Sequence, residues 1–108
     1  MSEAEDKTAA LLQQVWLRNR PMVEERLGRL DRAAAAAAAG TLAEELRKEA
    51  AEIAHKFAGS LGMFGYDHGS RVARKIELLI DYPAPDAARL SALTGLTVEL
   101  RKAILPDA

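Results

Sequence analysis

The stretch AHKFAGSLGMFG, from Ala54 to Gly65, places one histidine and three glycines in a segment with the apolar spacing of a helix. Glycine inside a helix costs about 1 kcal/mol relative to alanine, which this alanine-rich chain uses freely elsewhere. A histidine can serve as a general acid or base, a metal ligand or a nucleophile. The pattern therefore raises the question of whether the glycines leave space around His55.

The helical positions of these residues indicate an exposed imidazole. At about 100° per residue the large apolar side chains form one face, and His55 falls roughly 175° from the centre of that face. Gly59, Gly62 and Lys48 lie on the same side as His55. We therefore expect the two glycines to let the backbone or a loop of another protein approach the ring.

An exposed histidine of this kind can be used in three ways. A metal site lacks a second ligand, since Ala51 and Gly59 stand one turn before and after His55. A general base lacks a neighbouring nucleophile, and a convex helix face is not a pocket. A nucleophile that carries a group needs an accessible, mostly neutral ring, and Lys48 and Lys56 would favour an anionic group there.

The elements that would position His55 are helices, because apolar residues recur with helical spacing and no strand pattern is present. The predicted helices run Glu5–Asn19, Arg20–Ala39, Thr41–Phe64, Asp67–Ile80 and Asp86–Leu105. Pro21 is expected to break or kink the first, Gly40 to cap the second, and Thr41 with Glu44 to form a capping box. Pro83 and Pro85 mark a loop before the last helix. The predicted fold is all-α: an antiparallel up-down four-helix bundle, with the first helix as an additional N-terminal piece against one end, in a single domain of residues 1–108.

The same spacing also predicts which residues face inward. Leu11, Leu12, Val15 and Trp16 are expected to face the core from the first helix. Gly69 and Ser70 are expected to let the Thr41–Phe64 and Asp67–Ile80 helices approach closely. His68, the second histidine, is expected to be solvated or to cap a helix.

Composition restricts the classes of function. The 108 residues carry a net charge of -1, which does not favour nucleic-acid binding. The absence of cysteine excludes disulfides and thiolate chemistry. No apolar run reaches the roughly 20 residues of a membrane span, and the polar N-terminus does not read as a signal peptide. We therefore expect a cytoplasmic protein with neither membrane nor nucleic-acid partners.

The run His55-Lys56-Phe57-Ala58-Gly59, followed by Gly62 and Gly65, resembles the signature of histidine-containing phosphotransfer (HPt) domains of bacterial two-component phosphorelays. The family's usual pattern is His-x-Leu-Lys-Gly with further glycines downstream. The segment YDHGSRVARKIELL resembles the family's next helix, so the specific similarity extends over Glu52–Leu79. The match departs at Ala58, where many members have a lysine that is thought to steady the phosphoryl group, and Lys56 is the nearest substitute.

This resemblance implies a function for each matching position. His55 would accept a phosphoryl group from a receiver-domain aspartate and pass it to another receiver domain, and Gly59 would clear room for the partner. The residues expected to contact the partner are Lys48, Lys56, Gly59, Gly62, Arg71 and Arg74. For Arg71 and Arg74 the alternative is an ordinary solvated face. Magnesium would belong to the receiver domain, so the chain itself would hold no cofactor or metal.

The resemblance also bounds what kind of protein this is. The expected partners are response-regulator receiver domains and a hybrid histidine kinase, and the chain is expected to be a monomer. It has a nucleophilic histidine but no ATP-binding motif, so the word enzyme fits it loosely. Two alternatives stay open: a degenerate bundle that only binds proteins, and the histidine-bearing domain of a chemotaxis-type kinase separated from its catalytic part.

Overall fold

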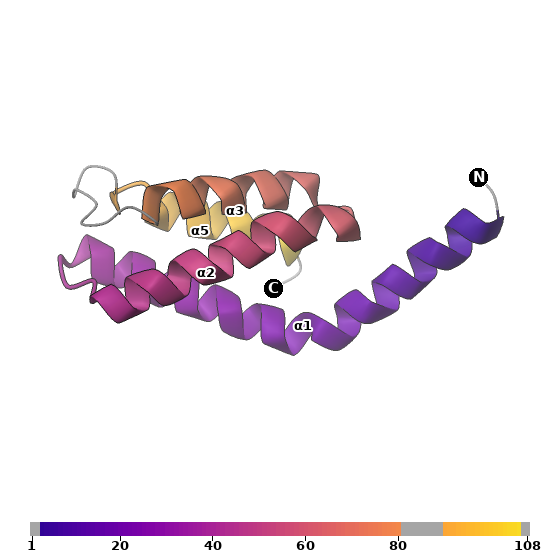
Figure 1. Cartoon of the computed structure of the whole chain (residues 1–108), viewed down its shortest axis with the longest axis horizontal. Helices are drawn as coiled ribbons and strands as arrows, with labels where there is room; N and C mark the ends of the chain where they lie inside the picture. Colours follow the sequence, from indigo (N-terminus) through magenta and orange to yellow (C-terminus); the bar gives the residue numbers. More distant parts are fainter. Residues whose placement is uncertain (1–2, 81–89, 107–108) are drawn as a thin grey trace.

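The computed structural model describes residues 3–80 and 90–106, which form four α-helices and one 3-10 helix and contain no strand. The helices are α1 (Glu3–Ala38), α2 (Glu44–Ser60), the 3-10 helix η1 (Leu61–Phe64), α3 (Asp67–Ile80) and α5 (Leu93–Ile104). Successive α-helices run in opposite directions along the long axis (Figure 1). The predicted all-α bundle is confirmed.

The core lies where the four α-helices face one another. α1 packs against α2, α2 against α3, and α3 against α5, and α5 closes the ring against α1. Large side chains with almost no exposed surface fill this space, and they include Leu27, Leu30, Phe57, Leu61, Ile76, Leu100 and Ile104. Full burial of each such side chain stabilises the fold by about 1.5–3 kcal/mol.

α1 is one continuous helix of 36 residues, so the predicted division into two helices at Asn19 and Arg20 is wrong. Pro21 lies inside α1, where the missing N–H removes one backbone hydrogen bond and favours a kink rather than an end. Figure 1 shows that α1 changes direction along its length. The helix continues because Trp16 and Val23, on either side of the proline, are both buried on the face that packs against the bundle.

The N-terminal part of α1 extends beyond the bundle instead of lying against its end (Figure 1). Leu11 and Val15, which were predicted to face inward, are 62% and 40% exposed, so that prediction is wrong. Leu12 is half-buried, and Trp16 is buried as predicted. Packing stops at Trp16 because its indole meets the rings of Phe64 and Tyr66, at centroid distances of 5.4 and 4.7 Å, where the bundle ends.

The turn between α1 and α2 follows one sequence signal and contradicts another. Gly40 has a φ of 72°, and the N–H of Thr41 bonds the carbonyl of Ala36 at 2.8 Å, which is the predicted glycine-capped end. The capping box is wrong, because α2 begins at Glu44 and its N-cap residue makes no side-chain cap hydrogen bond. The Thr41 hydroxyl instead donates to Ala36, at 3.4 Å.

Small side chains fill the contact between α2 and α3 and let the two helices lie close together. Ala50 and Ala54 of α2 and Ala73 of α3 have no exposed surface. The Ser70 hydroxyl donates to the carbonyl of Ala58 at 2.6 Å, which confirms its predicted role at this contact. Gly69, in contrast, faces α5 and η1 rather than α2.

Arg47 joins the start of α2 to the end of α3. Its side chain is buried, and it donates to the Ile80 carbonyl at 2.8 Å and to both carboxylate oxygens of Glu44. The hydrogen bonds from Arg47 hold the pKa of Glu44 below its ordinary value of 4.5. The capping prediction required the Glu44 carboxylate to accept a hydrogen bond from the backbone. It accepts hydrogen bonds from Arg47 instead.

The end of α2 follows the sequence pattern, but the last helix is shorter than predicted, because residues 91 and 92 form a turn and α5 begins at Leu93. The predicted Thr41–Phe64 helix is α2 continued by η1, and Gly65 ends it with a φ of 87°. Within α5, Leu93, Leu100 and Ile104 are buried. The predicted start at Asp86 and the loop at Pro83 and Pro85 lie outside the described residues.

We predict that Gly69→Ala destabilises the fold. The added Cβ would lie 2.7 Å from Cγ2 of Ile104, a buried branched side chain with little freedom to move. Overpacking of this kind costs about 1–3 kcal/mol, more than the gain in helix propensity. Gly59→Ala is the matched control, because no other part of the protein lies within 4 Å of that Cβ position, and it should stabilise by up to about 1 kcal/mol. Urea unfolding measures both, and equal stabilisation would contradict the close contact.

We also predict that Glu44→Gln lowers the melting temperature at pH 7 and that this difference becomes smaller in acid. A carboxyl group whose pKa is depressed on folding contributes stability above its unfolded pKa and loses that contribution as the pH falls through its folded pKa. The difference between wild type and variant should therefore shrink below about pH 4.5. Thermal unfolding by circular dichroism tests this, with the exposed Glu52→Gln as control; a difference independent of pH would contradict it.

Candidate functional site

His55 stands on the edge of α2 that borders α3, with 70% of its side chain exposed. The prediction of an imidazole in solvent is confirmed. Its position directly opposite the core is not, because Ala51 and Ala54, as well as the large apolar residues, are buried on the side facing α3. Counting only the large side chains had placed the centre of the buried face too far from His55.

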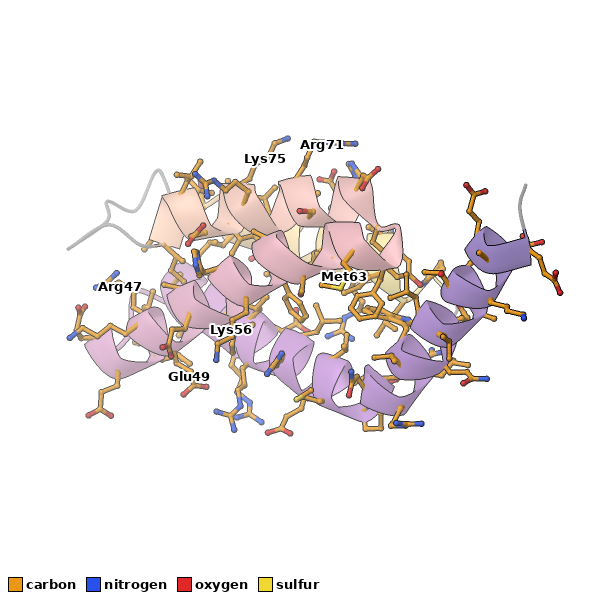
Figure 2. The ribbon with its side chains drawn as sticks, turned by 45° about the vertical axis from the view of Figure 1, so that its right-hand side comes forward. Arg47, Glu49, Lys56, Met63, Arg71 and Lys75 are labelled. Atoms are coloured by element: carbon orange, nitrogen blue, oxygen red, sulfur yellow. The ribbon has the colours of Figure 1, made fainter. Side chains whose placement is uncertain are left out.

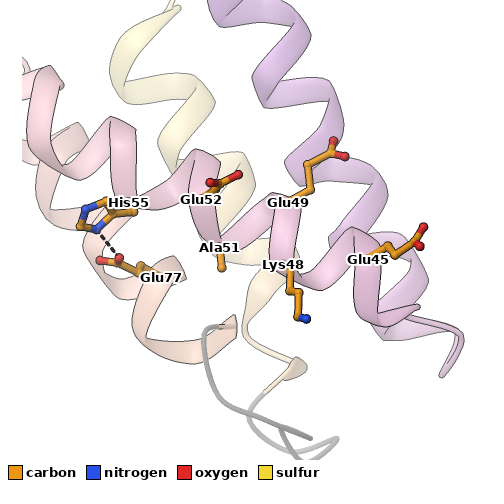
Figure 3. Close-up of a pocket in the computed structure, with 7 residues that line it drawn as sticks. All are labelled: Glu45, Lys48, Glu49, Ala51, Glu52, His55 and Glu77. Carbon is orange, nitrogen blue, oxygen red and sulfur yellow. Dashed lines mark hydrogen bonds and ion pairs between the residues drawn. The ribbon is translucent and has the colours of Figure 1, made fainter.

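Glu77 of α3 fixes one nitrogen of the ring. Its Oε2 lies 2.5 Å from Nδ1 of His55, and only 13% of its side chain is exposed (Figure 3). A carboxylate can only accept a hydrogen bond, so Nδ1 of the neutral ring must carry the proton. Nε2 is then the nitrogen with a free lone pair. Glu77 keeps the imidazole oriented while leaving most of the ring in solvent.

Arg74 shares the same carboxylate. Its Nη1 lies 3.6 Å from Oε1 of Glu77, while Oε2 of Glu77 faces His55. The three side chains therefore form a chain from guanidinium to carboxylate to imidazole. Sequence reasoning assigned Glu77 no role, because the contact joins positions on two different helices. The available signal was the segment YDHGSRVARKIELL, which contains Glu77 and resembles the family's next helix.

Two surface hollows of opposite charge meet at His55. The hollow that we call basic contains Arg71, Arg74 and Lys75, and its full lining is His55, Ala58, Gly59, Ser70, Arg71, Arg74 and Lys75. The hollow that we call acidic extends toward the start of α2 (Figure 3), and its lining is Glu45, Lys48, Glu49, Ala51, Glu52, His55 and Glu77. The imidazole thus lies on the border between a positive and a negative surface.

The predicted partner-contacting residues fall into three places. Gly59, Arg71 and Arg74 line the basic hollow with His55, and Lys48 lines the acidic hollow. Lys56 lies on the side of α2 that faces α1, whereas Arg71 projects outward from α3 (Figure 2). Gly62 is in η1, where an added Cβ would lie 3.7 Å from the Asp67 carboxylate, and it lines neither hollow.

The second histidine has a different setting. Nε2 of His68 lies 2.9 Å from Oε1 of Glu99, so the pair joins the start of α3 to α5. His68 is 57% exposed, in line with the predicted solvated position. Within residues 3–80 and 90–106, no group of three or more potential ligands is placed to hold a metal ion. No described helix is long and apolar enough to cross a membrane.

We predict that Glu77→Gln changes the tautomer of His55. The amide can either donate or accept, so it no longer requires the proton to be on Nδ1. Nitrogen-15 spectra of the imidazole at neutral pH should show mainly the Nδ1–H form in the wild type and a larger Nε2–H fraction in the variant. The signals of His68 serve as the internal control. An unchanged tautomer ratio for His55 would show that the carboxylate does not determine it.

Comparisons with known proteins agree with these features. A family model described as the Hpt domain matches residues 8–104. Protein RcaC of Microchaete diplosiphon is 29% identical over 76 residues, which cover 70% of this chain. The chain corresponds to only 12% of the length of that relative. No solved structure gives a significant match.

Proposed function

Because the chain belongs to the Hpt domain family, which implies histidine phosphotransfer in a phosphorelay, we propose that His55 is its phosphoryl carrier. His55 accepts the group from an aspartyl phosphate of one receiver domain and passes it to the aspartate of another. The observation that carries this proposal is the exposed imidazole whose Nδ1 is held by Glu77, because it leaves Nε2 free to react.

The transfer needs no general base on this chain. The Nε2 lone pair forms a bond to phosphorus while the bond between phosphorus and the aspartate oxygen breaks, and the aspartate leaves as a carboxylate. Nδ1 keeps its proton, so the phosphorylated ring carries a positive charge next to the Glu77 carboxylate. Glu77 stabilises that charge and orients the ring, and it is a positioning residue. The return step reverses the bonds and releases the neutral imidazole.

Gly59 supports the approach of a partner. It follows His55 by one turn on α2 and lines the basic hollow, with no other part of the protein within 4 Å of its Cβ position. The receiver domain must bring its aspartate into line with Nε2, and a long side chain at position 59 would stand in that path. A displacement of about 1 Å at a reacting centre can cost roughly a hundredfold in rate.

The proposal also includes the partners of the chain, its docking surface and its location. The partners are receiver domains, one of them in a hybrid histidine kinase, and magnesium is held by the receiver domain. Lys48, Lys56, Gly62 and Arg71 contribute to the docking surface around His55. The chain acts as a monomer in the bacterial cytoplasm, and it carries the phosphoryl group without binding ATP.

We predict that mixing the chain with a phosphorylated receiver domain yields an acid-labile, base-stable phosphate on His55. The label should be absent in His55→Gln and retained in His68→Gln, the control for the other histidine.

Gly59→Gln should keep its helical circular dichroism spectrum but transfer roughly tenfold more slowly or worse. Gly59→Ala, with a much smaller side chain, should stay close to the wild-type rate. Rapid-quench gel assays measure the transfer rate of the wild type and of the four variants.

Two results would contradict the proposal. A wild-type chain that binds the receiver domain but takes no label would instead be an interaction module without phosphotransfer. Full transfer by Gly59→Gln would remove the argument that the glycine provides access.

A further inference from the structure

The basic hollow carries a strong positive charge next to the reactive nitrogen. Arg71, Arg74 and Lys75 line it, and no carboxylate is among its lining residues. The acidic hollow on the other side of His55 is lined by four glutamates and one lysine. A phosphoryl group on His55 carries about two negative charges, so it is favoured on the basic side.

α2 itself brings no cation to that side of the ring. Apart from His55, the α2 residues that line the basic hollow are Ala58 and Gly59, and neither carries a charge. Lys56 lies on the side of α2 facing α1 (Figure 2), and Lys48 lines the acidic hollow. A cation that contacts the phosphoryl group must therefore come from α3.

Arg74 has the closest connection to the ring among the three candidates on α3. It shares Glu77 with His55, at 3.6 Å from Oε1, so a single carboxylate separates the guanidinium from the imidazole. Arg71 and Lys75 project outward from α3 (Figure 2). An arginine has five N–H donors in a planar fork, so Arg74 can contact Glu77 and a second anion at once.

We infer that Arg74 is the residue that binds and neutralises the phosphoryl group carried by His55, so that the cation of this site is supplied by α3. This inference rests on the proposed function. During transfer Arg74 donates hydrogen bonds to the phosphoryl oxygens and loses no proton. The bonds made and broken at phosphorus are those of the transfer itself. Glu77 thus stabilises the positive charge of the ring, and Arg74 stabilises the negative charge of the phosphoryl group.

Phosphoramidate provides the test, because this small phosphodonor needs no docking surface. Arg74→Gln should slow the appearance of phosphohistidine at residue 55 by about tenfold, a partial effect because the guanidinium is largely exposed. Phosphorus-31 spectra of the phosphorylated protein give a second measurement. Loss of the neighbouring cation should raise the pH at which the phosphoryl group titrates. Arg74→Lys should restore part of both.

Lys75→Gln is the matched control, since it removes one charge from the same hollow. It should stay within about twofold of the wild-type rate, as expected for an exposed charge that projects outward from α3. The nitrogen-15 tautomer of His55 should be unchanged in Arg74→Gln, which separates loss of the phosphoryl contact from disturbance of Glu77.

The outcomes also separate this inference from the proposed function. Equal rates and an unshifted phosphorus titration in Arg74→Gln, or the same losses in the Lys75→Gln control, would overturn the role of Arg74 alone. A changed tautomer in Arg74→Gln would also overturn it, since the effect would then run through Glu77. A wild-type chain that gains no phosphoryl group at His55 would overturn the proposed function as well.

Discussion

The close approach of α2 and α3 is the constraint on which the candidate site depends. Fully buried alanines, Ala54 on α2 and Ala73 on α3, keep the two helices near each other, and the Ser70 hydroxyl ties α3 to the α2 backbone at 2.6 Å. Only at this separation does Glu77 reach the His55 ring, at 2.5 Å. The fold and the chemistry are therefore linked through side chains that have no reactivity of their own.

The same packing explains why the ring can be both ordered and accessible. His55 lies at the edge of the contact between the helices, so one nitrogen meets a mostly buried carboxylate while the rest of the ring stays in solvent. A ring at the centre of the exposed face would be free to rotate. A ring in the core would be out of reach of a partner. The border position also puts it between the acidic and basic hollows, so the surrounding field differs on its two sides.

Sequence patterns predicted the features that depend on local spacing. The α3 helix, Asp67–Ile80, was predicted with its observed bounds, and the glycine-capped ends at Gly40 and Gly65 were also found. The exposure of His55 followed from its helical position. These features need no knowledge of how the helices pair.

Several of the failures depend on how the helices pack against one another. Pro21 signalled a break, but buried residues on both sides of it carry the helix through. Thr41 and Glu44 had the spacing of a capping box, but Glu44 bonds Arg47, whose guanidinium also reaches Ile80 at the end of α3. The partner of His55 could not be derived from spacing because it depends on the register between two helices.

The extension of α1 past the bundle affects how the molecule behaves in solution. The molecule measures 51 × 21 × 21 Å, and its radius of gyration is 15.0 Å, compared with about 13 Å for a compact domain of this length. Friction rises with elongation at constant mass. A single chain would therefore elute early from a sizing column and resemble a larger particle, so the number of chains is better determined by light scattering or sedimentation equilibrium, which do not depend on shape.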